Sequence, residues 1–200
     1  MNNTFVEVDG LSRKFGKIQA LQDICIGLEP GLVYGLVGAN GAGKTTLIKH
    51  LLGLMKAQQG CVRVFGMDPV RYPVEVLSRI GYLSEERDLP EWMSIDELLH
   101  FTAGYYHGWD QAYAAELIAT FGLITSKKIK QLSKGMRAQV GLVAAVGHRP
   151  DLLLLDEPSM GLAPMVISQI FKIIAEINAT GTTVLLVEQN AQQALSRSDR

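Results

Sequence analysis

The 200-residue sequence has no run of about 18 consecutive apolar residues, the length that a membrane-spanning helix needs. Its first residues, Met1-Asn2-Asn3-Thr4, lack the basic start and the apolar stretch of a secretory signal peptide. Internal repeats and low-complexity segments are also missing. We therefore expect a single domain over residues 1–200 and, if the protein acts at a membrane, a membrane-embedded part supplied by another chain.

The sequence also contains few cysteines and carries almost no net charge. The two cysteines, Cys25 and Cys61, both fall in strand-like runs, so we expect buried, reduced thiols and a cytosolic compartment. Lys and Arg number 19 and Asp and Glu number 20, which leaves a formal net charge of −1. That balance gives no reason to expect a nucleic-acid partner, whereas 48% hydrophobic residues are enough for a substantial core.

The chain does contain a full phosphate-loop pattern, G-x-x-x-x-G-K-[ST], over residues 38–45. The apolar run 32–37 predicts a buried strand before the loop. Leucine and isoleucine at helical spacing over residues 47–52 predict a helix after it. The candidate ligand-contacting residues of the loop are Gly38, Ala39, Asn40, Gly41, Ala42, Gly43, Lys44, Thr45 and Thr46.

Each part of this loop has a chemical reason. Glycines let the backbone adopt a positive φ and approach a ligand closely. Successive N–H groups then form an anion-binding nest at a helix N-terminus. By this pattern Lys44 contacts the β- and γ-phosphates and the Thr45 hydroxyl holds Mg²⁺. The alternative is a glycine-rich turn that binds nothing, and the loop alone does not distinguish a kinase, a GTPase or an ATPase.

The remaining pattern predicts an α/β fold around the loop. Residues 4–8 and 18–28 are strand-like and predict an N-terminal antiparallel β piece. The connection between them, residues 12–17, contains Phe15, which either stacks on a purine base or packs in the core. A stretch at about 86–148 has helical spacing, so we expect an inserted helical subdomain there.

Two further apolar runs, 151–155 and 182–187, predict central parallel strands. Open α/β sheets place their ligands at the carboxyl ends of such strands. We therefore predict a mostly parallel P-loop NTPase core in which the residues after these two runs meet the loop. An acidic pair in such a place can also act only as a helix cap. The residues that follow the two runs are Asp156, Glu157, Glu188 and Gln189.

The segment 132–137, Leu-Ser-Lys-Gly-Met-Arg, lies between the loop and the acidic pair. At this point the chain resembles the ATP-binding subunit of an ABC transporter, and the resemblance covers essentially all 200 residues. The family signature is Leu-Ser-Gly-Gly-Gln, from which Lys134 and Met136 depart, while Ser133 and Gly135 remain. The resemblance implies a head-to-tail dimer in which Ser133 and Gly135 contact the γ-phosphate of the ATP bound by the other subunit. Alone, a serine before a helix is an ordinary cap.

The same resemblance implies ATP and Mg²⁺ as ligands and gives roles to other residues. Phe15 takes the adenine-stacking position. Asp156 supports Mg²⁺, and Glu157 is the carboxylate that polarises the attacking water as a general base. Lys44 joins Glu157 as a catalytic residue.

Three positions depart from the family pattern. Glu85 replaces the Q-loop glutamine, although a carboxylate can still ligate Mg²⁺ and meet a coupling helix. Ala163 replaces the D-loop aspartate, which weakens communication across the dimer. Gln189 replaces the switch histidine, and it can still donate and accept a hydrogen bond in catalysis but carries no charge.

The resemblance also implies partners and a location. It implies an integral-membrane permease, a second ATP-binding subunit (identical or different) and a place on the cytoplasmic face of the membrane. Residues 80–158 resemble the ATPases of drug and ion exporters, whereas the tail, with Leu-Val-Glu-Gln-Asn-Ala, resembles those of branched-chain amino-acid importers. The longer, exporter-like part favours export, with import as the alternative. The family normally continues with further strands, so we expect a C-terminal truncation.

Two rival functions stay open. Ala163 and Gln189 favour an ATP-binding clamp with little hydrolysis, which a phosphate-release assay separates from an ATPase. A protein that acts on DNA or ribosomes is the second rival, although no aromatic residue is interleaved with the basic run that suggests it. That run comprises Lys127, Lys128, Lys130, Lys134 and Arg137.

Overall fold

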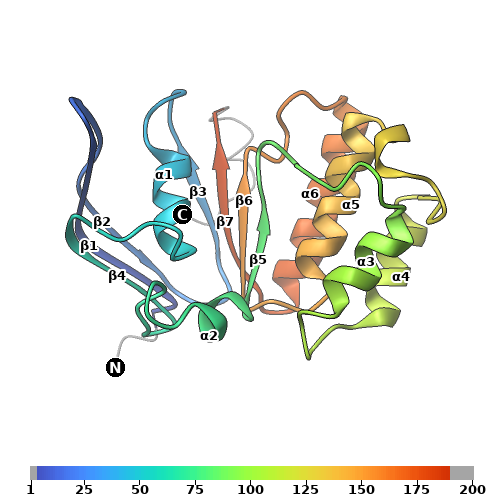
Figure 1. Cartoon of the computed structure of the whole chain (residues 1–200), viewed down its shortest axis with the longest axis horizontal. Helices are drawn as coiled ribbons and strands as arrows, with labels where there is room; N and C mark the ends of the chain where they lie inside the picture. Colours follow the sequence, from blue (N-terminus) through green and yellow to red (C-terminus); the bar gives the residue numbers. More distant parts are fainter. Residues whose placement is uncertain (1–3, 190–200) are drawn as a thin grey trace.

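The computed structural model describes residues 4–189, and Figure 1 shows two β-sheets side by side with helices between and beside them. One sheet is antiparallel, with the strand order β2-β1-β4, and the other is parallel, with the order β3-β7-β6-β5. The strands are β1 (Val6–Phe15), β2 (Ile18–Leu28), β3 (Val33–Val37), β4 (Gln59–Val64), β5 (Ile80–Leu83), β6 (Leu152–Asp156) and β7 (Thr183–Glu188).

The helices form two layers around the parallel sheet. Helix α1 lies between the antiparallel and the parallel sheet, while α5 and α6 cover the opposite face, with α3 and α4 outside them (Figure 1). No helix in the described range 4–189 is long and apolar enough to cross a membrane. The helices are α1 (Lys44–Leu51), α2 (Pro73–Leu77), α3 (Ile95–Ala103), α4 (Gln111–Thr120), the 3₁₀ helix η1 (Ile129–Gln131), α5 (Lys134–Val146) and α6 (Pro164–Ala179).

Strand β6 explains why the sequence contains four consecutive leucines. Leu152 and Leu154 face the hydrophobic cluster on the α1 side, and Leu153 and Leu155 face the cluster on the α5 and α6 side. All four are fully buried. A parallel strand covered on both faces has no solvent side, so a continuous apolar run replaces the usual alternation. The two predicted central strands are confirmed.

The helical region begins each longer helix with a polar cap. Ser94 and Glu97 form a reciprocal capping box at α3, and Asp110 accepts from the Tyr113 amide at α4. These bonds satisfy amides that a helix start otherwise leaves without partners. The apolar faces of α3, α4 and α5 join the same cluster as Leu153 and α6. The range 86–148 thus contains the predicted helices, although the first of them begins only at Ile95. These helices share their core with the parallel sheet.

Two predictions about the N-terminal sheet are wrong. Strand β1 continues to Phe15, so the turn comprises only Gly16 and Lys17 and the segment 12–15 is strand. Both cysteines are exposed. Asp9 lies on the outer face of the sheet opposite Cys61, and the Cys25 thiol is 3.7 Å from the Asp9 carboxylate. Because side chains alternate between faces, a strand-like run alone could not place these thiols inside.

Candidate nucleotide-binding site

The carboxyl ends of the four parallel strands meet at one edge of the sheet. Val37, the last residue before the loop, is the register partner of Glu188 in β7. Asp156 in β6 pairs with Val187, and β5 ends at Leu83, directly before the segment that contains Glu85. The predicted meeting of the loop with the acidic strand ends is therefore present.

The loop leads directly into α1 and leaves the helix start open. Gly43, the residue before α1, has a φ of 89° and no side-chain cap, and the first turn contains no acidic residue. An added Cβ at Gly43 would overlap the carbonyl oxygen of Ala20 in β2, so only glycine fits between the two backbones. The uncapped N–H groups and the positive end of the helix dipole suit an anion.

Lys44 lies at the centre of the site. Its side chain is only 7% exposed. The ammonium donates to the carbonyl oxygens of Gly38, at 2.7 Å, and Ala39, at 3.1 Å. It also forms an ion pair with Glu157, with 3.3 Å between Nζ and Oε1. Three acceptors fill the three donor positions of an ammonium, so phosphate oxygens must displace at least one of them to reach Lys44.

Asp156 is a buried carboxylate with one close polar neighbour, the Thr45 hydroxyl. It is 1% exposed, and neither carboxylate oxygen has a hydrogen-bond partner of good geometry among the described residues. Burial raises the pKa of Asp156, the Thr45 hydroxyl and the Lys44 charge oppose the rise, and the charges of Glu85 and Glu157 add to it. An unpaired buried charge is costly, and a divalent cation held jointly with the Thr45 hydroxyl would remove that cost.

The donor set fits Mg²⁺ rather than a transition metal. The described residues contain no group of three or more His, Cys, Asp or Glu side chains that could hold a metal ion. Mg²⁺ ordinarily uses one or two carboxylates, waters and substrate phosphates, so one carboxylate and one hydroxyl beside a phosphate loop suffice. Glu85 lies close enough for its charge to help raise the pKa of Asp156. Burial, followed by the charges of Asp156, Glu86 and Glu85, also raises the pKa of nearby Tyr82 to about 12.

Other predicted residues lie outside this cluster. Phe15 is 41% exposed under the guanidinium of Arg13, whose Cζ is 4.8 Å from the ring centroid, so it is not a core residue. Ser133 caps α5 by accepting from the Met136 amide at 3.2 Å. Gly135 follows it in the first turn of α5, and Gln189 is exposed directly after β7.

Two more charged residues lie at this edge, beside the turn that follows Glu157. Arg87 and Glu188 are both buried there. The sequence placed Glu188 at this strand end without giving it a role. Arg87 lies in a polar stretch, and no spacing marks it.

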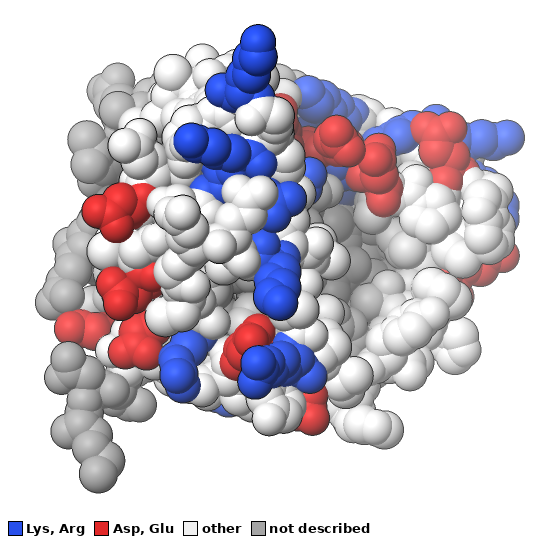
Figure 2. Space-filling view, turned by 60° about the vertical axis from the view of Figure 1, so that its left-hand side comes forward, with Lys and Arg blue, Asp and Glu red and all other residues white. Residues whose placement is uncertain are grey.

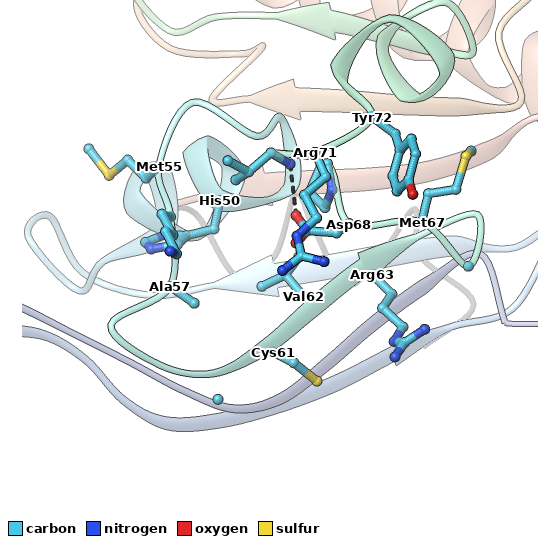
Figure 3. Close-up of a pocket in the computed structure, with 15 residues that line it drawn as sticks. His50, Met55, Ala57, Cys61, Val62, Arg63, Met67, Asp68, Arg71 and Tyr72 are labelled. Atoms are coloured by element: carbon cyan, nitrogen blue, oxygen red, sulfur yellow. Dashed lines mark hydrogen bonds and ion pairs between the residues drawn. The ribbon is translucent and has the colours of Figure 1, made fainter.

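Another cavity lies away from this site. It measures about 630 Å³ and lies between the end of α1 and the edge strand β4. Figure 3 shows His50, Cys61, Arg63 and Tyr72 around it. None of the predicted nucleotide-contacting residues lines this cavity, so it is separate from the phosphate loop.

The basic run at residues 127–137 is partly neutralised. Lys128 pairs with Glu97 at 3.0 Å, and Arg137 pairs with Glu91 at 2.8 Å. On another face, that of the antiparallel sheet, Lys and Arg form a band that acidic residues border (Figure 2). On both surfaces acidic residues pair with or border the basic ones, whereas a surface that binds nucleic acid is typically a basic patch or stripe.

Comparison with known proteins decides the family. The sequence profile described as "ABC transporter" matches residues 21–160. The chain belongs to the ABC transporter family. Members of its ATP-binding branch are ATPases coupled to transport, and the predicted P-loop NTPase fold is confirmed with the family. A solved structure of an ATP-binding subunit of an ABC transporter superposes with a TM-score of 0.89, at 31% identity, over 98% of this chain and 84% of the other.

Relatives of this ABC domain carry different names. The high-affinity branched-chain amino acid transport ATP-binding protein BraG of Pseudomonas aeruginosa is 37% identical over 96% of this chain and 85% of BraG. The daunorubicin/doxorubicin resistance ATP-binding protein DrrA of Streptomyces peucetius is 36% identical over 98% of this chain. The chain spans only 61% of the length of DrrA. Both resemblances found in the sequence are thus real, and the direction of transport stays open.

Proposed function

We propose that this ABC domain binds Mg-ATP at the phosphate loop and hydrolyses it to drive export through a separate integral-membrane permease. The observation that carries the proposal is the Lys44 ion pair with Glu157 beside the unpartnered Asp156. A loop that binds nothing would have no need to bury a cation and two carboxylates together. Measuring phosphate release from Mg-ATP tests the proposal.

The geometry supports a simple order of events. Incoming β- and γ-phosphates compete with Glu157 for the Lys44 ammonium. Their arrival frees the Glu157 carboxylate to accept a proton from the attacking water, as a general base. Thr45, Asp156 and Glu85 would hold Mg²⁺, and the ion would supply positive charge against the phosphates. Phe15 is 41% exposed, and the ring face that Arg13 leaves open can stack on adenine.

A second ATP-binding subunit would complete the site through Ser133 and Gly135. Ser133 is exposed at the start of α5, where its hydroxyl and the amides of Lys134 and Gly135, which this cap leaves free, can meet a phosphate from outside.

Ser133→Arg is expected to lower ATPase activity without lowering the ATP affinity of the monomer. The bulky side chain would block closure against the partner's nucleotide and leave the chain's own loop intact. Steady-state phosphate release and titration with a fluorescent ATP analogue measure the two effects. Loss of monomer affinity would show instead that Ser133 contacts the ATP of its own chain.

Gln189 would act as an uncharged switch residue. A glutamine amide can hold the γ-phosphate and position water, but a neutral hydrogen bond is roughly half as strong as a charge-assisted one. We therefore propose slow but real hydrolysis, with no histidine-like titration between about pH 6 and 7 from this position.

Gln189→Ala is expected to slow single-turnover hydrolysis at saturating ATP, because both hydrogen-bonding ends of the side chain are removed. Gln189→His should raise the rate if Ala163 lets the site respond. An unchanged rate in Gln189→Ala would remove Gln189 from the mechanism. It would then favour the ATP-binding clamp. Ala163 at the start of α6 supports that alternative, because it supplies no carboxylate where the family has an aspartate.

The permease would dock in a groove of about 410 Å³ between the sheet edge and the helical region. Ser84 and Leu89 line it next to Glu85, and Tyr106 lines it from the end of α3. The exposed ring pair of Phe101 and Tyr105 also lies at the end of α3, with ring centroids 5.2 Å apart. Exposed aromatic residues of this kind are typical of protein interfaces.

The direction of transport can be tested with the permease that copurifies with the chain. Export predicts ATP-dependent accumulation of cargo in inverted membrane vesicles, where the ATPase side faces outward. Accumulation inside intact cells instead would assign the chain to an importer, in line with its similarity to BraG.

A further inference from the structure

The turn formed by residues 157–160 carries the proposed general base in a strained conformation. Glu157 has a φ of 50°, a region that side-chain-bearing residues rarely occupy. Strained residues persist only where their surroundings hold them in place. The Glu157 amide donates to the Val187 carbonyl at 2.9 Å, which fixes one side of the residue.

Arg87 fixes the other side of the turn. Its guanidinium donates from Nη2 to the carbonyl oxygens of Glu157, at 3.2 Å, and Pro158, at 2.9 Å. Nη1 donates to the carbonyl oxygen of Met160 at 3.3 Å. Arg87 is only 4% exposed. A rigid planar fork can satisfy several carbonyls of one turn at once, which a lysine ammonium cannot do in the same geometry.

Glu188 holds the same turn from β7. It is 2% exposed, and its Oε1 accepts from the Ser159 amide at 3.1 Å. Burial raises the pKa of Glu188 and lowers that of Arg87, and the charge of each residue partly offsets the shift of the other. Two buried side chains of opposite charge thus hold one turn. Arg87 donates to carbonyl oxygens of the turn, and Glu188 accepts from an amide of the turn.

Arg87 also connects the turn to the proposed permease groove. Its own amide donates to Ser84 Oγ at 3.2 Å. Ser84, Asp88 and Leu89 line the groove. Arg87 therefore lies in the same chain segment as residues that a docked permease would contact.

We propose that Arg87 and Glu188 are positioning residues that hold Glu157 in place for hydrolysis. The proposal rests on the ATPase function proposed above. Neither residue contacts the phosphate loop in the hydrogen bonds and ion pairs of residues 4–189. Their loss should therefore change the chemical step and leave ATP binding unchanged.

The test uses the purified chain with Arg87→Met, Arg87→Lys, Glu188→Gln and the double variant Arg87→Met with Glu188→Gln. For Arg87→Met we expect kcat to fall on the order of 100-fold, the cost of a misplacement of about 1 Å, with unchanged affinity for a fluorescent ATP analogue. Arg87→Lys keeps the charge opposite Glu188 and should lie between Arg87→Met and wild type. The double variant should be no slower than Arg87→Met, because both residues act on one turn and their effects are not additive.

Arg149→Met is the matched control. It removes a partly exposed guanidinium that pairs with Asp110 at 3.1 Å, away from the turn. Wild-type kcat in Arg87→Met, or a loss of ATP affinity as large as the loss of kcat in both Arg87 variants, would overturn the proposal. Absence of hydrolysis in the wild-type chain would instead overturn the ATPase function on which it rests.

Discussion

Glu157→Gln is expected to bind Mg-ATP at least as tightly as the wild type and to hydrolyse it roughly 10²–10⁴-fold more slowly, the usual contribution of a general base. Glutamine keeps the shape of the side chain but cannot accept the proton. The substitution also removes the ion pair with Lys44, which frees the ammonium for the phosphates. A negative charge that would repel the γ-phosphate disappears as well.

Single-turnover hydrolysis and analogue titration measure both halves of this expectation. The stalled variant should also accumulate as a nucleotide-bound dimer on gel filtration. Glu176→Gln, an exposed position on α6 that pairs only loosely with Lys172 at 3.9 Å, is the control and should behave as wild type. Wild-type turnover in Glu157→Gln would remove Glu157 from the mechanism.

Lys44→Ala is expected to abolish tight ATP binding. It removes the buried cation nearest to the expected phosphates, although the backbone amides of the loop remain. Hydrogen bonds to charged groups contribute about 1.5–3 kcal/mol each, and each 1.4 kcal/mol is about tenfold in affinity. Two lost phosphate contacts therefore predict an affinity at least about 100-fold weaker.

The loss has a second cause within the protein. Without Lys44, Glu157 stays buried with no cation opposite it, next to the unpartnered Asp156, so the empty site becomes more repulsive to phosphate. Titration with the fluorescent ATP analogue measures the change, and Lys49→Ala, an exposed lysine on the same helix, serves as the control. An affinity equal to wild type in Lys44→Ala would mean that the loop is not the nucleotide site.

What the sequence could predict here depended on local chemistry. The phosphate loop, the leucines of β6 and the serine before α5 can each be recognised from a few neighbouring residues. In the structure they lie before α1, within β6 and at the N-cap of α5, respectively. The exposed cysteines and the extension of β1 to Phe15 were missed, because alternation and pairing between strands decide them.

Arg87 shows the same limit at the functional site. Its partners lie 70 to 73 residues away in the chain, and only the folded sheet brings β5 and β6 together. A buried arginine in a polar stretch has no periodic neighbours that would reveal it. The candidate ligand positions could therefore be named from the sequence, whereas the residues that hold those positions in place required the fold.

The most direct test of the central claim is phosphate release from saturating Mg-ATP by the wild-type chain, measured beside Glu157→Gln and beside the wild type with Mg²⁺ chelated. We expect slow but sustained release by the wild type with Mg²⁺ and none above background in the other two. Release by the wild type that is no faster than that of Glu157→Gln would contradict it.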